Sequence, residues 1–574
     1  MKRAFLGFGP LIIAVAAGAL ALRCGGDDNR FDSDGGGGDA TTGGPDSPFQ
    51  QPDGAPSVYD DFPSTPIVDP SLPSNIATLF GSADAGAGAP PCIAEPAADA
   101  MIPKNWTPLF LEYAAPGANV YEIRVSIDNQ TTSAVVYTPN PTYTFDQNLW
   151  KVVEGHSAGH DVTLSIRGAT LATGVLSAIT AEETSTIHIA PVDAPGSVVY
   201  WSSTGGSAFR GFTVGDMTSK LVLTPATAGA SSAGDGTTTC VACHTSSPDG
   251  TYVLYTRDTD QTNRAIDARS VVGAAAPAAT DISPSALALL GRDHEGAPVL
   301  SQAHYGATDS VAISVLLNAA TGSPNYQLVW TDLHAADASG WGVLARTGDP
   351  NVGITSPAWR HDGTAIAYVS ATSSGEAVIA NAPVMDIYTV PYNNKAGGTA
   401  SPLAGASDPN YHEFYPVYSP NDTLLAFNRT ANTCDYSATD GPSNTHCENS
   451  YNQPAAELYL VPGGGGSAQR LRANDPPTCT GLVSPGLTNS WPRWAPQAQT
   501  FGQYNYYWIV FSSKRRPATG LNPQLYVAAV VTKGTGSSET LYADYPAVYV
   551  LSQDPTQNNH TPAWDNFNVQ GIPN

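Results

Sequence analysis

Charged side chains are scarce in this sequence. They make up 13% of its 574 residues, about half of the ~25% found in an average soluble protein. Basic side chains are the scarcest, with 25 Lys and Arg against 50 Asp and Glu and a formal net charge of −25. No basic run extends beyond Lys514-Arg515-Arg516. Because a nucleic-acid binder needs basic patches to neutralise phosphates, the sequence excludes nucleic acid as a partner.

Enzyme motifs and helix-forming composition are lacking as well. There is no Gly-x-Ser-x-Gly elbow, and His294-Glu295 lacks the second histidine of a zinc-protease helix. No glycine-rich phosphate loop precedes a helix, so we expect no nucleotide cofactor. The chain is rich in Thr, Ser and Tyr and contains 55 Gly and 47 Pro, with a hydrophobic share of 41%. This composition favours strands and turns, and it predicts an all-β fold.

Residues 1–24 have the features of a secretory signal. A positively charged start precedes an apolar run over residues 11–22, which is short for a membrane span. Cys24 follows at once and resembles the lipidated cysteine of a bacterial lipoprotein, although Arg23 departs from the small residue preferred there. Cleavage after Ala21 is the alternative. We expect an exported protein, held at the outer membrane only by its lipid anchor and facing the periplasm or the cell surface.

Residues 25–100 have the composition of a disordered linker. From Cys24 to residue 100 the chain has 13 acidic residues and one arginine, and Gly and Pro occupy 23 of 77 positions. Such an acidic, Gly/Pro-rich stretch buries little apolar surface and repels itself. We predict a linker that holds the folded part away from a surface.

Residues 101–192 show short alternating strands separated by turn residues. Expected strands cover residues 109–113, 120–125, 134–137 and 162–166. About 90 residues of this pattern predict an immunoglobulin-like β-sandwich.

Residues 193–574 contain an internal repeat. Its clearest copies begin with Ser-Pro-Ala-Trp at 356–359, Tyr-Pro-Val-Tyr at 415–418 and Trp-Pro-Arg-Trp at 491–494, and further copies lie near 248, 300 and 562. A turn then leads into an apolar strand, so each unit is a small sheet that must pack against its neighbours. The repeats predict a β-propeller of six blades, with seven as the alternative. The last copy is too short for a sheet, and residues 197–201 and 210–214 are expected to supply its missing strands.

This repeat resembles that of TolB-type propellers, whose consensus is close to Pro-x-Trp-Ser-Pro-Asp-Gly followed by a strand. The resemblance covers about two thirds of the chain. It implies an exported bacterial WD40-like propeller and says more about fold and location than about activity. Under the binding-scaffold hypothesis below, the propeller face and the sandwich would recognise a protein or glycan.

Cys240, Cys243 and His244 form a Cys-x-x-Cys-His motif, the attachment signature of c-type haem. Two thiols at this spacing reach the two vinyl groups of one haem, and the adjacent imidazole meets the iron on the proximal side. The motif predicts one covalent haem c, with His244 as the proximal iron ligand. A Cys240–Cys243 disulfide and a zinc site are the alternatives. The CxxCH motif is followed closely by Ser-Pro-Asp-Gly. This arrangement resembles that of exported TolB-like proteins with a cytochrome-like insertion.

The opposite axial ligand is not evident from the sequence. The candidates for the sixth position are Met217, His304, Met385 and His412, and an open position is a further alternative.

The other cysteines suggest disulfides, since an exported protein meets an oxidising environment. Cys434 and Cys447 flank a polar insertion and are expected to pair. Cys92 with Cys479 is the remaining pairing, which would fasten the end of the linker to the propeller.

Two function classes follow. The first is an electron-transfer or redox-sensing protein with a haem on Cys240, Cys243 and His244, which would need a redox partner. The second is a non-catalytic binding scaffold in which the CxxC is a disulfide. A third alternative is a propeller hydrolase, whose acids and histidines would gather at the central channel from different blades and would leave no motif.

Overall fold

The computed structural model describes residues 61–82, 86, 88–230, 236–258, 264–270, 281–292, 294–306, 309–318, 325–372, 385–431, 453–516, 522–567 and 569. These residues form an all-β protein with a few short helices, as the composition predicts. None of the helices among them is long and apolar enough to cross a membrane. The predicted signal, Cys24, and the Cys434 and Cys447 pair lie outside the described residues.

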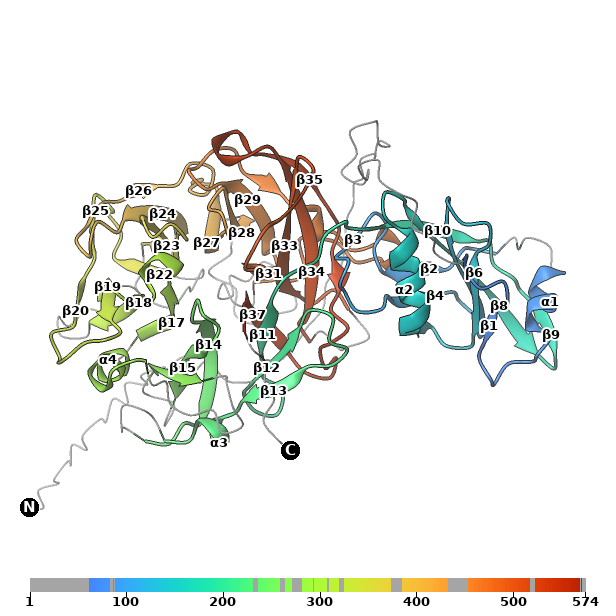
Figure 1. Ribbon diagram of the computed structural model, residues 1–574, viewed down its shortest axis with the longest axis horizontal. Helices are drawn as coiled ribbons and strands as arrows, with labels where there is room; N and C mark the ends of the chain where they lie inside the picture. The colour runs from blue at the N-terminus through green and yellow to red at the C-terminus, as the bar shows by residue number, and fades with distance from the viewer. Residues whose placement is uncertain are drawn as a thin grey trace, which may run out of the picture.

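A first domain of two sheets lies beside a larger ring of sheets (Figure 1). The larger sheet of this domain has the order β1 (Ile67–Val68), β6 (Ala134–Thr138), β5 (Val120–Ile127), β8 (Val162–Ala172), β10 (Glu183–Ile189) and β3 (Met101–Ile102), with β9 (Val175–Ser177) on β8. The smaller sheet has the order β2 (Cys92–Glu95), β4 (Phe110–Ala114) and β7 (Thr142–Thr144). All four strands expected from the alternating pattern are present. The edge strands β1 and β3 pair in parallel with β6 and β10.

The predicted linker ends earlier than residue 100. Residues from 61 onward belong to the first domain: β1 pairs with β6, helix α1 (Ile76–Gly81) buries Ile76 and Phe80, and β2 enters the smaller sheet. Phe62 is also buried in the domain core. A few widely spaced apolar side chains are enough to dock a segment whose average composition is that of a disordered one.

Helix α2 (Gln147–His156) interrupts the expected run of strands. The carboxylate of Asp146 accepts hydrogen bonds from the backbone N–H groups of Asn148 and Leu149, which is an N-cap. Leu149, Trp150 and Val153 then fall on one buried face of the helix. The spacing of these residues is helical, and the surrounding strand pattern obscured it.

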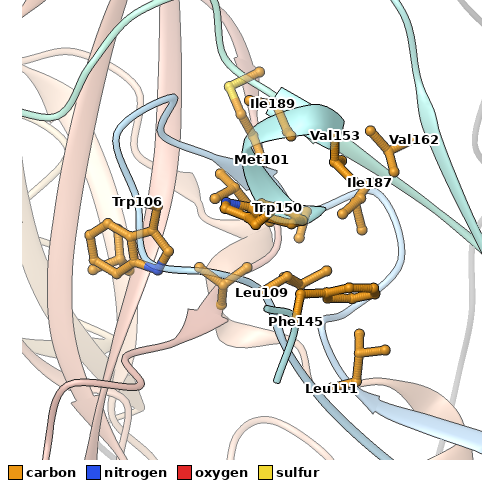
Figure 2. Packing of buried hydrophobic residues seen from close by; sticks show 14 of the residues in the cluster. Met101, Trp106, Leu109, Leu111, Phe145, Trp150, Val153, Val162, Ile187 and Ile189 are labelled. Carbon is orange, nitrogen blue, oxygen red and sulfur yellow. The ribbon is translucent and has the colours of Figure 1, made fainter. Parts of the chain in front are cut away.

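Figure 2 shows how this helix packs in the first domain. Trp150 and Val153 point into a cluster with Leu109 and Phe145, and Ile187 of β10 closes it from the larger sheet. Each of these side chains is at most 6% exposed. Full burial of side chains of this size contributes roughly 1.5–3 kcal/mol each, so this cluster is what holds helix and sheets together.

The second part consists, in the described residues, of six main sheets that follow one another along the chain. The first two sheets contain β13 (Lys220–Leu223), β12 (Ala208–Thr213), β11 (Ser197–Ser202) and β37 (Asn559–Asp565), and then β14 (Cys240–Ser246), β15 (Tyr252–Asp258) and β16 (Arg264–Ser270). The third and fourth contain β17 (His294–Leu300), β18 (Val311–Asn318), β19 (Asn325–Asp332) and β20 (Trp341–Val343), and then β22 (Gly353–Trp359), β23 (Ala365–Ala371), β24 (Met385–Pro391) and β26 (Ser401–Pro402). The fifth and sixth contain β27 (Tyr411–Tyr418), β28 (Leu424–Ala431), β29 (Glu457–Pro462) and β30 (Gln469–Arg470), and then β31 (Ser490–Trp494), β33 (Tyr504–Ser513), β34 (Gln524–Lys533) and β35 (Thr540–Asp544) with β32 (Gln499–Phe501) and β36 (Val548–Tyr549). The small pair β21 (Ala345–Thr347) and β25 (Gly397–Thr399) and the short helices α3 (Pro225–Ala228) and α4 (Pro284–Leu290) lie between them.

The innermost strands of these sheets touch in a closed circle. β14 contacts β17, β17 contacts β22, β22 contacts β27, β27 contacts β31, β31 contacts β37, and β37 contacts β14. This is the radial arrangement of a β-propeller (Figure 1). The C-terminal strand β37 pairs with β11, Val198 opposite Trp564, so the two ends of the ring share one sheet. The strand closure predicted from residues 197–201 and 210–214 is confirmed.

The first domain is joined firmly to the ring. One continuous apolar cluster runs from Trp106 and Leu109 of the first domain to Tyr506, Trp508 and Val548 of the β31–β35 sheet. Shared apolar burial of this kind makes the two parts one rigid unit.

Candidate functional site

The sequence repeat forms the innermost strands of the ring. In β22, β27, β31 and β37 the residue before the proline has a positive φ: Ser356 at 48°, Tyr415 at 53°, Trp491 at 63° and Thr561 at 45°. The pairing register shifts at this residue in β22, β27 and β31, so it is the extra residue of a β-bulge. The following prolines are buried, whereas Ser356 and Trp491 are in contact with solvent. The bulge therefore leaves Ser356 and Trp491 partly exposed, whereas Tyr415 and Thr561 at the same position are buried.

The turns after these strands, Asp362-Gly363 and Asn421-Asp422, connect neighbouring sheets. Asp422 accepts hydrogen bonds from the backbone N–H groups of His361 and Asp362 in the preceding sheet, at 2.8 and 2.9 Å. Asp362 in turn caps its own turn by accepting from Thr364. The conspicuous turn motif of the repeat thus has a structural role.

The CxxCH motif is a modified copy of the same repeat. When the Ser-Pro-Asp-Gly turn at 247–250 is aligned with the turn at 360–363, Cys243 falls at the position of Ser356, and His244 at that of the buried proline. The structure agrees, because the pairing of β14 with β15 shifts between Ala242 and His244. The motif lies within a strand, and Cys243 is the bulge residue of that strand.

Each part of the motif has a defined state in the structure. Cys240 is disulfide-bonded, and Cys243 carries a thiol. The alternative of a Cys240–Cys243 disulfide is therefore not realised. His244 is 5% exposed, packs on the Phe209 ring with centroids 4.4 Å apart, and its Nε2 lies 3.0 Å from the carbonyl oxygen of Val199. Burial lowers the pKa of His244 to about 4, so the imidazole is neutral.

This arrangement does not fit a covalent haem. One of the two sulfurs needed for the thioether bonds is used in a disulfide. The Nε2 atom of His244 is used by Val199, and the ring is enclosed by Phe209. A porphyrin on this imidazole would have to displace part of the sheet β13–β12–β11–β37, which closes the ring.

The proposed axial ligands lie in different settings. Met217 is 41% exposed. His304 is held by Asp309 through Nδ1 at 2.8 Å and stacks on Trp359. Met385 and His412 are fully buried in the ring.

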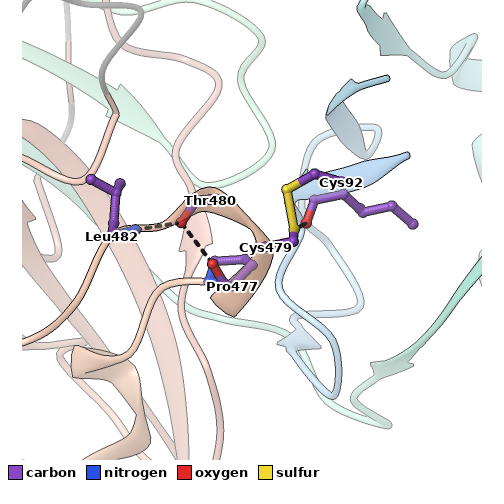
Figure 3. The surroundings of a disulfide bond; sticks show 6 residues. Cys92, Pro477, Cys479, Thr480 and Leu482 are labelled. Carbon is purple, nitrogen blue, oxygen red and sulfur yellow. Dashed lines mark hydrogen bonds between the residues drawn. A yellow bond between two sulfur atoms is a disulfide. The ribbon is translucent and has the colours of Figure 1, made fainter. Parts of the chain in front are cut away.

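The disulfide expected between Cys92 and Cys479 is present, with a sequence separation of 387 residues. Figure 3 shows Cys92 on β2 of the first domain bonded to Cys479 on a short turn of the ring. That turn is closed by the Thr480 hydroxyl, which donates to the Pro477 carbonyl at 2.6 Å and accepts from the N–H of Leu482.

The ring centre gathers a polar and aromatic group that sequence reasoning missed. Here it is called the central cluster, and it consists of Cys243, Ser246, Tyr415, Trp491, Arg493 and Asp565. Its members come from β14, β27, β31 and β37, four of the innermost strands. Asp565 accepts a hydrogen bond from the Ser246 hydroxyl, across 319 residues of sequence. The rings of Tyr415 and Trp491 have centroids 4.0 Å apart.

Arg493 is the cation of the central cluster. Burial lowers the pKa of its guanidinium to about 10, against the opposing influence of Asp565, Tyr415 and Cys243. These three groups belong to three other innermost strands, and the guanidinium itself lies over the Trp491 ring, 5.3 Å from its centroid. A signal for this residue exists in the sequence, since the other copies of the repeat have Ala358, Val417 and Ala563 at the same position.

Asp565 is the carboxyl group of the central cluster. Burial raises its pKa to about 7, against the influence of His361 and Arg493. Ser246 donates to Asp565 rather than to a histidine, which is not the arrangement of a Ser-His-Asp nucleophile. Among the described residues no three His, Cys, Asp or Glu side chains are grouped so that they could hold a metal ion.

Comparison with known proteins gives a limited result. No family model and no curated protein matches the chain. Among solved structures, a putative TolB from Agrobacterium tumefaciens has a TM-score of 0.31 and 12% identity over 64% of this chain and 97% of that one. A nidogen/laminin complex has a TM-score of 0.31 and 12% identity over 62% and 100%. Hydrazine synthase of Kuenenia stuttgartiensis has a TM-score of 0.31 and 11% identity over 64% and 91%. These TM-scores are too low to support an argument about the fold. The evidence for the ring is the strand pairing and the strand contacts within this chain.

Proposed function

We propose that the chain is an exported binding scaffold: a six-bladed TolB-like propeller fixed to an immunoglobulin-like domain, tethered through a lipid on Cys24 and without catalytic activity. Its binding partner would be a protein or glycan that contacts the ring. The Cys92–Cys479 bond fits an oxidising compartment outside the cytoplasm.

The observation that carries this proposal is the fixed interface between the two parts. Besides the shared apolar cluster and the disulfide, Arg516 pairs with Glu112 at 2.7 Å and Arg472 pairs with Asp99 at 2.6 Å. A binding surface held rigid in advance loses little conformational entropy when the ligand arrives. An interface this extensive suits recognition by preformed surfaces better than a mechanism that needs domain motion.

A c-type haem on Cys240, Cys243 and His244, acting in electron transfer or redox sensing, is the second candidate. The motif itself favours it. It requires Cys240 to be released from its disulfide and His244 to leave Val199 before maturation. The hydrolase alternative has no support from the central cluster, where, in the described part of the chain, Ser246 donates to Asp565 and not to a histidine.

One experiment separates these candidates. The full chain is produced in cells that carry the c-type maturation machinery and that load a control cytochrome with haem. We expect an exported, colourless protein with no haem stain on a denaturing gel. A covalent haem signal that disappears in the Cys243→Ala variant would overturn the scaffold proposal and establish a cytochrome.

A further inference from the structure

Arg493 is a cation that pairs with no carboxylate among the described residues. Within the described residues its only hydrogen bond runs from Nη1 to the carbonyl oxygen of Pro492 at 2.8 Å, and it forms no ion pair there. The guanidinium lies over the Trp491 ring, 5.3 Å from its centroid. An arginine has five N–H donors, so most of the donors of Arg493 are unused within the described residues.

The charge of Arg493 persists at neutral pH. Its pKa of about 10 is lowered by burial but stays well above 7. A half-buried guanidinium that keeps its charge gains from an anion more than an exposed one does, because there is less water to screen the interaction.

The surroundings of Arg493 define the kind of anion. We propose that the central cluster binds a singly charged carboxylate, a proposal that rests on the proposed binding function. The guanidinium of Arg493 would donate hydrogen bonds to the carboxylate, and the Trp491 ring would contact the apolar part of the ligand. The planar guanidinium donates two parallel hydrogen bonds to a carboxylate. Trp491 is partly exposed beside it, and Tyr415 supports the indole from the neighbouring strand.

The charge balance disfavours more highly charged ligands. Asp565 interacts electrostatically with Arg493 and adds a negative charge as it ionises. The whole chain has a net charge of −25, which repels polyanions at a distance. Phosphorylated ligands and acidic polymers would meet both effects, whereas a monocarboxylate with an aromatic or aliphatic group meets them least.

Benzoate is a direct probe, since it combines one carboxylate with one ring, and benzamide is its neutral control. Titration calorimetry on the full exported chain would compare wild type with Arg493→Lys, Arg493→Gln and Trp491→Phe. We expect benzoate to bind and benzamide not to bind. Loss of a charge-assisted bidentate contact should weaken binding by about tenfold to a hundredfold in Arg493→Gln and by less in Arg493→Lys.

Arg292→Gln is the matched control variant. Arg292 also lies over an indole, 3.9 Å from the Trp341 ring, but Trp341 is on β20, the outermost strand of its sheet. Its benzoate affinity should equal that of wild type. Circular dichroism and thermal unfolding identify any variant that has lost its fold.

The result that overturns the proposal is distinct from failure of the proposed function. If the chain is colourless and folded but binds neither benzoate nor the smaller acetate, the carboxylate site is wrong and the scaffold remains. If folded Arg493→Gln and Arg493→Lys proteins both bind benzoate as wild type does, the site is elsewhere and the proposal is also wrong. A covalent haem would instead refute the scaffold.

Discussion

Arg516 donates its Nε–H to Oε2 of Glu112 at 2.7 Å, and this pair joins the last sheet of the ring to the first domain. The guanidinium also lies 4.3 Å from the centroid of the Tyr549 ring, and both partners are mostly shielded from water, at 13% and 21% exposure. Removing the charge of only one partner lowers the stability of the folded protein, because the other charge stays partly buried without its partner.

Glu112→Gln should therefore destabilise the protein by about 1–2 kcal/mol, which urea unfolding would measure. Lys220→Gln is the control, since its 3.9 Å pair with Asp216 is exposed and should contribute less than about 0.5 kcal/mol. Equal effects of the two substitutions would show that the interface pair has no special weight.

The Cys92–Cys479 disulfide should stabilise the folded chain strongly. It closes a loop of 387 residues, and cross-links of long loops contribute about 3–5 kcal/mol by restricting the unfolded chain. The double variant Cys92→Ser/Cys479→Ser should unfold at a correspondingly lower urea concentration. A midpoint that does not move would mean that the apolar interface alone fixes the two parts.

His188 should make stability depend on pH on the alkaline side. Burial alone would lower its pKa, but hydrogen bonds to Asp161 and Asp99 outweigh burial and raise the pKa to about 9. Because this value lies above the unfolded one of about 6.5, the stabilisation is complete below pH 6.5 and is lost as pH rises through 9.

The free energy of unfolding should fall by about 1–3 kcal/mol between pH 6.5 and 9.5. The lower end of this range applies because both aspartates are partly exposed, and solvent weakens their interaction with His188. In His188→Gln this fall should disappear. His160→Gln, which removes a histidine paired with the exposed Asp128, should retain it.

His412 should make the protein sensitive to acid. It is fully buried, neither ring nitrogen has a hydrogen-bond partner among the described residues, and burial lowers its pKa to about 4. Below pH 6.5 the unfolded chain takes up a proton that the folded chain does not, so stability is lost as pH falls toward 4.

His412→Phe should reduce the loss of stability between pH 8 and pH 5 by about 2 kcal/mol. The readout is a difference between two pH values, so a packing defect of the variant does not affect it. The exposed His334→Phe should leave the acid sensitivity of wild type unchanged.

Asp565 should make carboxylate binding depend on pH. Burial raises its pKa to about 7, against His361 and Arg493, and Ser246 is its hydrogen-bond donor. The carboxyl group is ionised at pH 8 and repels an anion, whereas at pH 6 it is protonated. Benzoate affinity should therefore rise by about threefold to tenfold from pH 8 to pH 6. In Asp565→Asn the affinity should be high at both values, and a wild-type pH profile in that variant would contradict the assignment.

The strand pattern and the repeat could be predicted because their information is local. Alternating apolar residues mark β4, β5, β6 and β8, and a proline after a positive-φ residue marks the innermost strands β22, β27, β31 and β37. The segment around Phe62, Ile76 and Phe80 could not be predicted from its composition. Its few apolar residues are buried only because a preformed sheet offers a surface for them.

The candidate site divides in the same way. The CxxCH motif is visible at once, but whether Cys240 is oxidised and what His244 contacts depend on Val199 and Phe209, which belong to the closing sheet. Arg493 differs from Ala358 and Val417 in an aligned repeat, so a comparison of the copies could have singled it out.

By itself the sequence determined the all-β class, the repeated strand-turn-strand unit and the closing of the ring by its two ends. Each depends on side-chain alternation and turn residues within a few positions of one another. Only the tertiary structure decided that the Tyr415 ring contacts Trp491 and that Ser246 donates to Asp565. Their sheets meet because the ring closes, and ring closure joins residues as far apart as Ser246 and Asp565.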